Sequence, residues 1–188
     1  MENKLVVKST ELFKDFEVWE SFSELVKLMP SIKSYWMKKF IEQLKTIKKP
    51  DTWSFNSKGN GGVWYLSSNI EKDGSLGIWI EDTTLSLWAN SSLYDIVKIE
   101  DMINSEEFFS LKNLFLDSET SNFPEGYIFR TNDVFQFESY ASLDDDQFKW
   151  LAGNKPEMLV DQLNERLQNF FTPEITELFQ KINDATRR

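Results

Sequence analysis

Residues 61–90 constrain the fold more than any other part of the chain, because their side chains alternate as they do in β-strands. Aliphatic residues recur at every second position in residues 76–80 and again in residues 85–89. A period of two places these side chains on one face of a sheet. Residues 63–66 are aromatic and aliphatic, a composition that favours a half-buried strand. The segment therefore predicts a three-stranded antiparallel meander.

Two tight turns are expected to join these strands. Residues 72–75 read Lys-Asp-Gly-Ser, and an Asp-Gly pair between apolar runs is a strong hairpin signal because glycine accepts a positive φ. Residues 81–84 predict the second turn. If the strand registers allow it, Trp64, Trp79 and Trp88 share the face opposite the aliphatic side chains. We interpret both faces as core, with an aromatic surface on the second face as the alternative.

The N-terminal part of the chain predicts a helical hairpin over residues 1–49. Apolar residues follow one another at spacings of three and four across residues 12–29, which is typical of an amphipathic helix. Pro30 interrupts this pattern, and a second helix is expected over residues 32–48. Because the interruption is short, the two helices should pack antiparallel.

The rest of the chain completes an α+β fold in a single domain, residues 1–188. Residues 50–140 form the expected sheet region, with an inserted helix near 105–116 and two further strands at 126–131 and 134–140. This gives a mostly antiparallel sheet of about five to six strands. Residues 141–188 predict C-terminal helices packed on the sheet, since Thr172-Pro173 is a typical cap and first helical position.

The composition narrows the chemistry of the chain. It has no Cys and no His, so disulfides, thiolate nucleophiles, imidazole bases and the common zinc sites are excluded. No phosphate-binding or calcium-binding loop motif is present. The run Asp144-Asp145-Asp146 is better explained as a helix cap than as a metal site. We therefore predict no catalytic residues, no metal site, no cofactor and no enzymatic activity.

The charge is unevenly distributed. Residues 1–60 carry 11 Lys and 8 Asp or Glu, whereas residues 61–188 carry 10 Lys or Arg and 23 Asp or Glu. The acidic part should repel nucleic acid and attract a protein with a basic surface. The many lysines of residues 32–49 are interpreted as a solvated helix face. No apolar run approaches the roughly 20 residues that span a bilayer, and no secretion signal is recognised, so a cytoplasmic protein is expected.

These features predict a non-enzymatic acidic protein that binds and inhibits another protein, such as an immunity protein, an antitoxin or a phage-encoded anti-defence inhibitor. The carboxylates between the two sheet segments are the candidate contacts, with surface solubility as an equally good explanation. They are Glu100, Asp101, Glu106, Glu107, Asp117 and Glu119. The alternative function is a small-molecule or peptide-binding module that uses Trp64, Trp79 and Trp88 as an aromatic sheet face.

Overall fold

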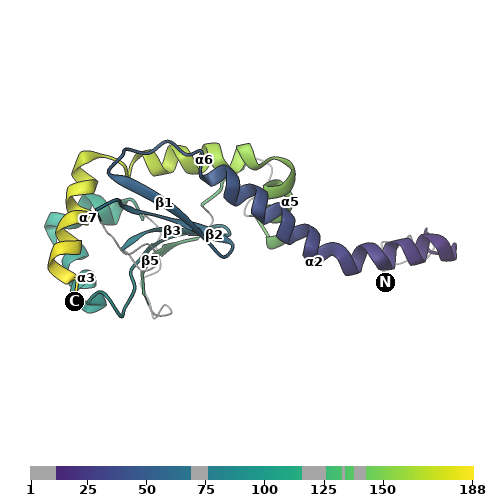
Figure 1. The fold of residues 1–188 in the computed structure, drawn as a ribbon, viewed down its shortest axis with the longest axis horizontal. Helices are drawn as coiled ribbons and strands as arrows, with labels where there is room; N and C mark the ends of the chain where they lie inside the picture. The colour runs from purple at the N-terminus through teal and green to yellow at the C-terminus, as the bar shows by residue number, and fades with distance from the viewer. Residues whose placement is uncertain (1–11, 69–75, 116–125, 133, 138–142) are drawn as a thin grey trace, which may run out of the picture.

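The sheet is a five-stranded antiparallel meander in which every strand pairs with its neighbour in the chain (Figure 1). The computed structural model describes residues 12–68, 76–115, 126–132, 134–137 and 143–188. In these residues the strand order is β1-β2-β3-β4-β5. The strands are β1 (Trp53–Lys58), β2 (Gly61–Leu66), β3 (Gly77–Glu81), β4 (Thr84–Trp88) and β5 (Tyr127–Thr131). The predicted α+β class is confirmed.

Helices precede the sheet, interrupt it between β4 and β5, and follow it. Figure 1 shows α6 running along one side of the sheet, with α7 and α3 at the end of the molecule far from the N-terminal helix. The predicted C-terminal helices are thus confirmed. The helices are α2 (Phe16–Leu44), α3 (Ile96–Ile103), the short 3-10 helix η1 (Glu106–Phe108), α4 (Phe109–Asn113), α5 (Asp145–Asn154), α6 (Pro156–Gln168) and α7 (Pro173–Thr186).

The predicted N-terminal helical hairpin is wrong, because α2 is one continuous helix of 29 residues with Pro30 inside it. A proline removes one hydrogen bond of the helix and leaves the others intact. Pro30 is exposed, so water can satisfy the carbonyl group that loses its partner. Figure 1 shows the helix bending near its middle, which is the usual effect of an internal proline.

One face of the sheet packs against the C-terminal helices through aromatic side chains. Trp53 of β1 is fully buried, and its ring centroid lies 5.3 Å from that of Phe171 and 5.0 Å from that of Phe179. Its indole N–H donates a hydrogen bond to Thr176 Oγ1 at 3.0 Å. The polar atom of this large side chain is therefore satisfied inside the core, as buried tryptophan requires.

The C-terminal half of α2 is held by α5 and α6. Phe40 is fully buried, and its ring lies 5.5 Å from that of Phe148 and 6.3 Å from that of Phe135. Gly153 of α5 allows a close approach, because a Cβ at this position would lie 2.1 Å from the indole ring of Trp36. This packing fixes where α2 leaves the body of the protein.

One predicted strand differs from the structure in detail. Residues 134–137 belong to no strand, and the remainder of that predicted strand lies outside the described residues. The predicted turn at residues 72–75 also lies outside them. Residues 58–62 form a hairpin: Gly59 and Asn60 join β1 to β2, and Gly59 has a φ of 57°. Glycine adopts this left-handed conformation without steric cost.

Candidate functional site

The N-terminal half of α2 carries large apolar side chains that are exposed to solvent. Figure 1 shows this half projecting away from the sheet and from the other helices. Its exposed apolar side chains have 40–72% of their surface accessible to solvent. They are Phe16, Val18, Trp19, Phe22, Leu25, Val26 and Leu28, with Leu12 just before the helix. The largest apolar patch of a typical monomer is about 300–600 Å² and is often functional, so we treat this helix face as the candidate site.

Five of these side chains and the partly exposed Met29 form one stripe along the helix, which we call the α2 stripe: Phe16, Trp19, Phe22, Leu25, Val26 and Met29. The stripe continues the spacing of three and four residues by which Met37, Phe40 and Leu44 are buried against the body. The same face of α2 is therefore buried in the core along the C-terminal half of the helix and exposed along the N-terminal half. The stripe has the composition of a helix-packing surface.

Aromatic rings give the stripe a defined shape. The ring centroid of Phe13 lies 5.3 Å from that of Trp19 and 4.7 Å from that of Phe22, and the rings of Trp19 and Phe22 are 6.3 Å apart. Aromatic anchors of this kind dominate the free energy of protein interfaces, because they bury a large area at a small cost in side-chain entropy.

The two halves of α2 carry opposite charge. Residues 12–30 contain four carboxylates and two lysines, whereas residues 31–49 contain six lysines and one carboxylate. On the projecting half, Glu17, Glu20 and Glu24 lie on the side opposite the stripe, because their positions fall about half a turn from it. The apolar stripe is therefore not interrupted by these charges.

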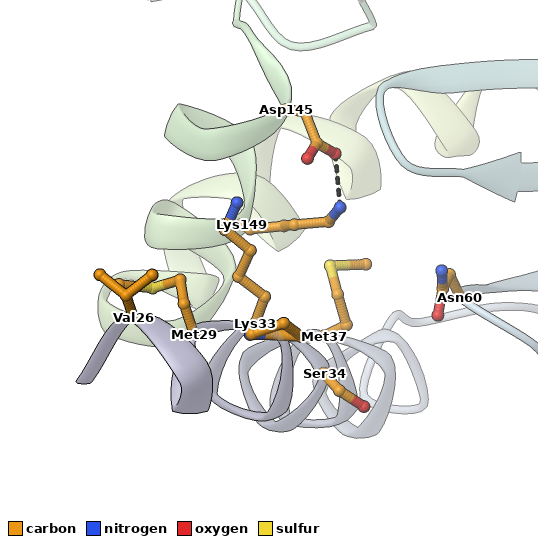
Figure 2. Close-up of a pocket in the computed structure, with 9 residues that line it drawn as sticks. Val26, Met29, Lys33, Ser34, Met37, Asn60, Asp145 and Lys149 are labelled. Carbon is orange, nitrogen blue, oxygen red and sulfur yellow. Dashed lines mark ion pairs between the residues drawn. The ribbon is translucent and has the colours of Figure 1, made fainter. Parts of the chain in front are cut away.

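A cavity of about 580 Å³ opens where the projecting half meets the body (Figure 2). The stripe leads directly into this cavity, since Val26 and Met29 belong to both. Its volume lies in the roughly 300–1,000 Å³ range of binding pockets. The cavity is lined by Val26, Met29, Pro30, Lys33, Ser34 and Met37 of α2, by Asn60 of the β1–β2 turn, and by Asp145 and Lys149 of α5.

Two ion pairs border this cavity. Lys149 Nζ lies 2.5 Å from Asp145 Oδ1, and Lys33 donates a hydrogen bond to Asp146 (Figure 2 draws the first pair). This hydrogen bond raises the pKa of Lys33, so its ammonium group stays charged at neutral pH. Asp144 caps α5 in a capping box with Gln147, which confirms that the aspartate run is a cap.

Asp82 is a further carboxylate near Lys149. It occupies the β3–β4 turn with a φ of 48°, and its Oδ1 is buried without a hydrogen-bond partner among the described residues. Burial raises the pKa of Asp82, and the nearby Lys149 ammonium opposes this shift. Lys149 therefore faces carboxylates both at the cavity and at this turn.

The carboxylates predicted to contact a partner lie at the other end of the molecule from the α2 stripe (Figure 1). Glu100 and Asp101 lie on α3, and Glu106 and Glu107 lie on η1; all four residues are exposed. Glu107 forms an ion pair of 2.8 Å with Lys181. The other two predicted residues, Asp117 and Glu119, lie outside the described residues. The role of these carboxylates stays a prediction.

The three tryptophans do not share one face. The register pairs Trp64 with Ile78 and pairs Trp79 with Val63, so Trp64 and Trp79 point to opposite sides of the sheet. Trp64 is fully buried on the helix-covered face and packs on Phe55. Trp79 and Trp88 are partly exposed, with ring centroids 5.6 Å apart. Trp64 is therefore not part of the predicted aromatic surface.

Neighbours of Trp79 that the sequence did not single out complete a polar and aromatic cluster on that second face. Ser86 lies between Trp79 and Arg130 in the register. The Arg130 guanidinium lies 6.0 Å from the Tyr127 ring centroid, and the Tyr127 hydroxyl lies 3.4 Å from a Glu81 carboxylate oxygen. Burial, with a smaller effect of Glu81, raises the pKa of Tyr127. These residues lie together because of the strand register, which the sequence alone does not supply.

Comparison with known proteins gave no match among family models, curated proteins or solved structures. In the described ranges, no helix is long and apolar enough to cross a membrane. The same ranges contain no cluster of three or more acidic side chains arranged to hold a metal ion. The candidate site consequently rests on the geometry of α2 and of the cavity at its base.

Proposed function

We propose that this chain is a non-enzymatic protein that binds another protein on the α2 stripe and blocks it. The observation that supports the proposal is the projecting helix half with seven large apolar side chains open to solvent. An amphipathic helix of this kind docks by laying its apolar face into a groove.

The charge of the projecting half indicates the chemistry of the partner. Glu17, Glu20 and Glu24 line its polar side, where Lys27 is the one lysine and already pairs with Glu24 at 2.8 Å. The whole chain has a formal net charge of −10. We therefore expect the partner to present an apolar groove with a basic rim. Opposite charge accelerates association and disfavours acidic competitors.

Binding through the stripe is tested by capture with matched charge-introducing variants. Trp19→Glu or Phe22→Glu should reduce recovery of the partner at least about 30-fold, as expected for loss of an aromatic anchor. Phe109→Glu is the control, since Phe109 is also an exposed aromatic residue but lies on α4. Recovery from native extract is quantified for each variant, and the recovered protein is then purified and assayed for activity with and without this chain.

The proposal requires three results together. The recovered protein must bind the purified chain one to one, lose binding in the two stripe variants, and lose activity when bound. Recovery that is equal in all variants contradicts docking on the stripe. Recovery that falls in Phe109→Glu alone assigns the interface to the α3–η1 end, where the predicted carboxylates lie.

A second candidate function is ligand binding at Trp79 on the second face of the sheet. Trp79 Nε1 and Arg130 Nε are buried and have no acceptor among the described residues. A buried donor without a partner is costly. These two donors flank Ser86, and they fit a planar anionic ligand that stacks on Trp79. Benzoate and nucleoside monophosphates are suitable probes in fluorescence titrations. Quenching that is present in the native chain and absent in Arg130→Gln supports this function, and a flat titration excludes it.

A further inference from the structure

We propose that the C-terminal half of α2, together with the α5–α6 corner and the β1–β2 hairpin, binds single-stranded nucleic acid. The surface is separate from the α2 stripe, so the inference goes beyond the function proposed above. It also departs from the interpretation of the lysines of residues 32–49 as a solvated helix face. The reason is the place in the fold of the lysines that have no acidic partner.

Two neighbouring cavities lie along this half of α2, which packs against α5 and α6 (Figure 1). The larger cavity, of about 500 Å³, opens between α2 and the α5–α6 corner. The smaller cavity, of about 190 Å³, opens between α2 and the β1–β2 hairpin. Lys38 and Glu42 line both cavities, so the two form one groove across the helix, which we call the lysine groove.

The ammonium groups along the lysine groove have no acidic partner. Among the described residues, Lys38 and Lys58 form no ion pair and no side-chain hydrogen bond, and the ammonium group of Lys39 contacts only the ring of Tyr35. Other lysines of α2 and α5 pair with carboxylates. Glu42 is the one carboxylate among the described residues that line the groove, and it pairs with a lysine three positions on. The groove therefore has a local excess of positive charge, in a chain whose formal net charge is −10.

Two exposed aromatic rings flank the larger cavity, and each has a lysine ammonium group near its ring. Lys39 Nζ lies 5.3 Å from the ring centroid of Tyr35, and Lys155 Nζ lies 5.9 Å from that of Trp150. Tyr35 has 59% of its surface exposed, and Trp150 has 45%. Trp150 lies one turn before Asn154, which lines the cavity, so both side chains are on one face of α5. The cavity thus has an aromatic ring on the α2 side and another on the α5 side.

Phosphates and unpaired bases match these two features. Proteins that bind single strands combine a basic groove, which follows the sugar-phosphate backbone, with aromatic rings on which successive bases stack. An acidic peptide would satisfy the lysines and leave both rings exposed to water. The bases of a duplex already stack on one another, so their faces are not available to the rings. Single-stranded nucleic acid is the occupant that uses both the charge and the rings.

The acidity of the rest of the chain weakens this binding without excluding it. The exposed carboxylates of α3 and η1 lie at the end of the molecule away from the projecting helix (Figure 1). At 0.1 M salt, exposed charges more than about 10 Å apart are largely screened from one another. Local charge in the groove therefore dominates, and we expect a dissociation constant on the order of 10⁻⁶–10⁻⁴ M, as for binding without sequence preference.

Fluorescence anisotropy with a labelled oligothymidine of about 12 nucleotides, a length within known site sizes, tests the inference. The affinity should fall with added salt with a logarithmic slope of about −2, the value for roughly three phosphates on a single strand. The double variant Lys38→Gln/Lys39→Gln should weaken binding at least about 10-fold and bring the slope closer to zero by about 1. Lys27→Gln/Lys181→Gln makes the same change in net charge on α2 and α7, outside the groove, and should stay within about twofold of the native chain.

The aromatic rings are tested separately from the charge. Tyr35→Leu and Trp150→Leu remove a ring without changing the net charge, and each should weaken binding at least about 5-fold, as expected for loss of one stacked base. Circular dichroism confirms that the variants are folded. Trp19→Glu on the α2 stripe should leave oligonucleotide binding within about twofold, so this surface and the proposed protein-binding surface can succeed or fail independently.

Four results would overturn the inference. The first is the absence of binding at low salt, and the second is equal binding by the two double-lysine variants. The third is competition by polyglutamate as strong as that by unlabelled oligothymidine, with no effect of Tyr35→Leu, which would assign the groove to an acidic protein. The fourth is equally strong competition by thymidine monophosphate or by a duplex of the same length, since neither uses several phosphates and unpaired bases together.

Discussion

Phe40→Ala is expected to lower the free energy of unfolding by about 3–5 kcal/mol, the usual cost of truncating a buried phenylalanine. Phe40 is fully buried and packs edge-on against the stacked rings of Phe148 and Phe135. These contacts join α2 to α5 and to the segment after β5, so few neighbouring side chains can move to fill the space. Urea denaturation followed by far-ultraviolet circular dichroism measures the effect, with the slope checked for unchanged two-state behaviour.

Phe109→Ala is the matched control for this prediction. It makes the same substitution at a side chain with 63% of its surface exposed, and the stability should change by less than about 0.5 kcal/mol. Equal losses in the two variants would mean that Phe40 does not anchor α2. A large loss confined to Phe40→Ala shows that the C-terminal half of α2 belongs to the core, which fixes the direction in which the projecting half leaves it.

Local sequence patterns predicted the sheet well, because alternation and turn chemistry are properties of short segments. The aliphatic side chains Ile78, Leu87 and Leu85 are buried on one face, as the period of two indicates. Alternation does not say which residue of one strand lies opposite which residue of the next. Alternation alone therefore predicts that Trp64 and Trp79 share a face, although the observed register places them on opposite faces.

The continuity of α2 was not predictable from a local rule. Proline ends many helices, but it costs only one hydrogen bond and a bend when the residues on both sides keep a strong helical pattern. The spacing of Trp19, Phe22 and Val26 continues into that of Phe40 and Leu44 without a change of face. That unbroken phase across Pro30 was the available signal for a single helix.

The cavity at the base of α2 lay beyond sequence reasoning because it joins distant parts of the chain. Lys33 and Asp146 are 113 positions apart, and their contact depends on how α5 packs against α2. Neither residue belongs to a recognisable motif. The composition of the stripe could be identified in advance, but its exposure could not, since an amphipathic helix has the same sequence whether its apolar face is covered or open.

Gly61→Val is expected to destabilise the fold by at least about 3 kcal/mol, because the change forces a side chain into a neighbouring backbone. A Cβ at Gly61 would lie 1.9 Å from the carbonyl oxygen of Ile80. Gly61 pairs with Lys58 of β1 and with Glu81 of β3, so β2 cannot shift without loss of ladder hydrogen bonds on both sides. Urea denaturation and the yield of folded protein measure the effect.

Gly59→Ala separates this steric effect from the general cost of replacing glycine. Gly59 lies two positions earlier in the same hairpin, and a Cβ there would meet no atom within 4 Å. Its φ of 57° is unfavourable for alanine, so a loss of about 1 kcal/mol is expected from the backbone alone. A loss at Gly61→Val no larger than this would contradict the close β2–β3 approach. A much larger loss would show that the close packing of β2 and β3 requires glycine at position 61. The same hairpin sets the position of Asn60 at the cavity beside α2.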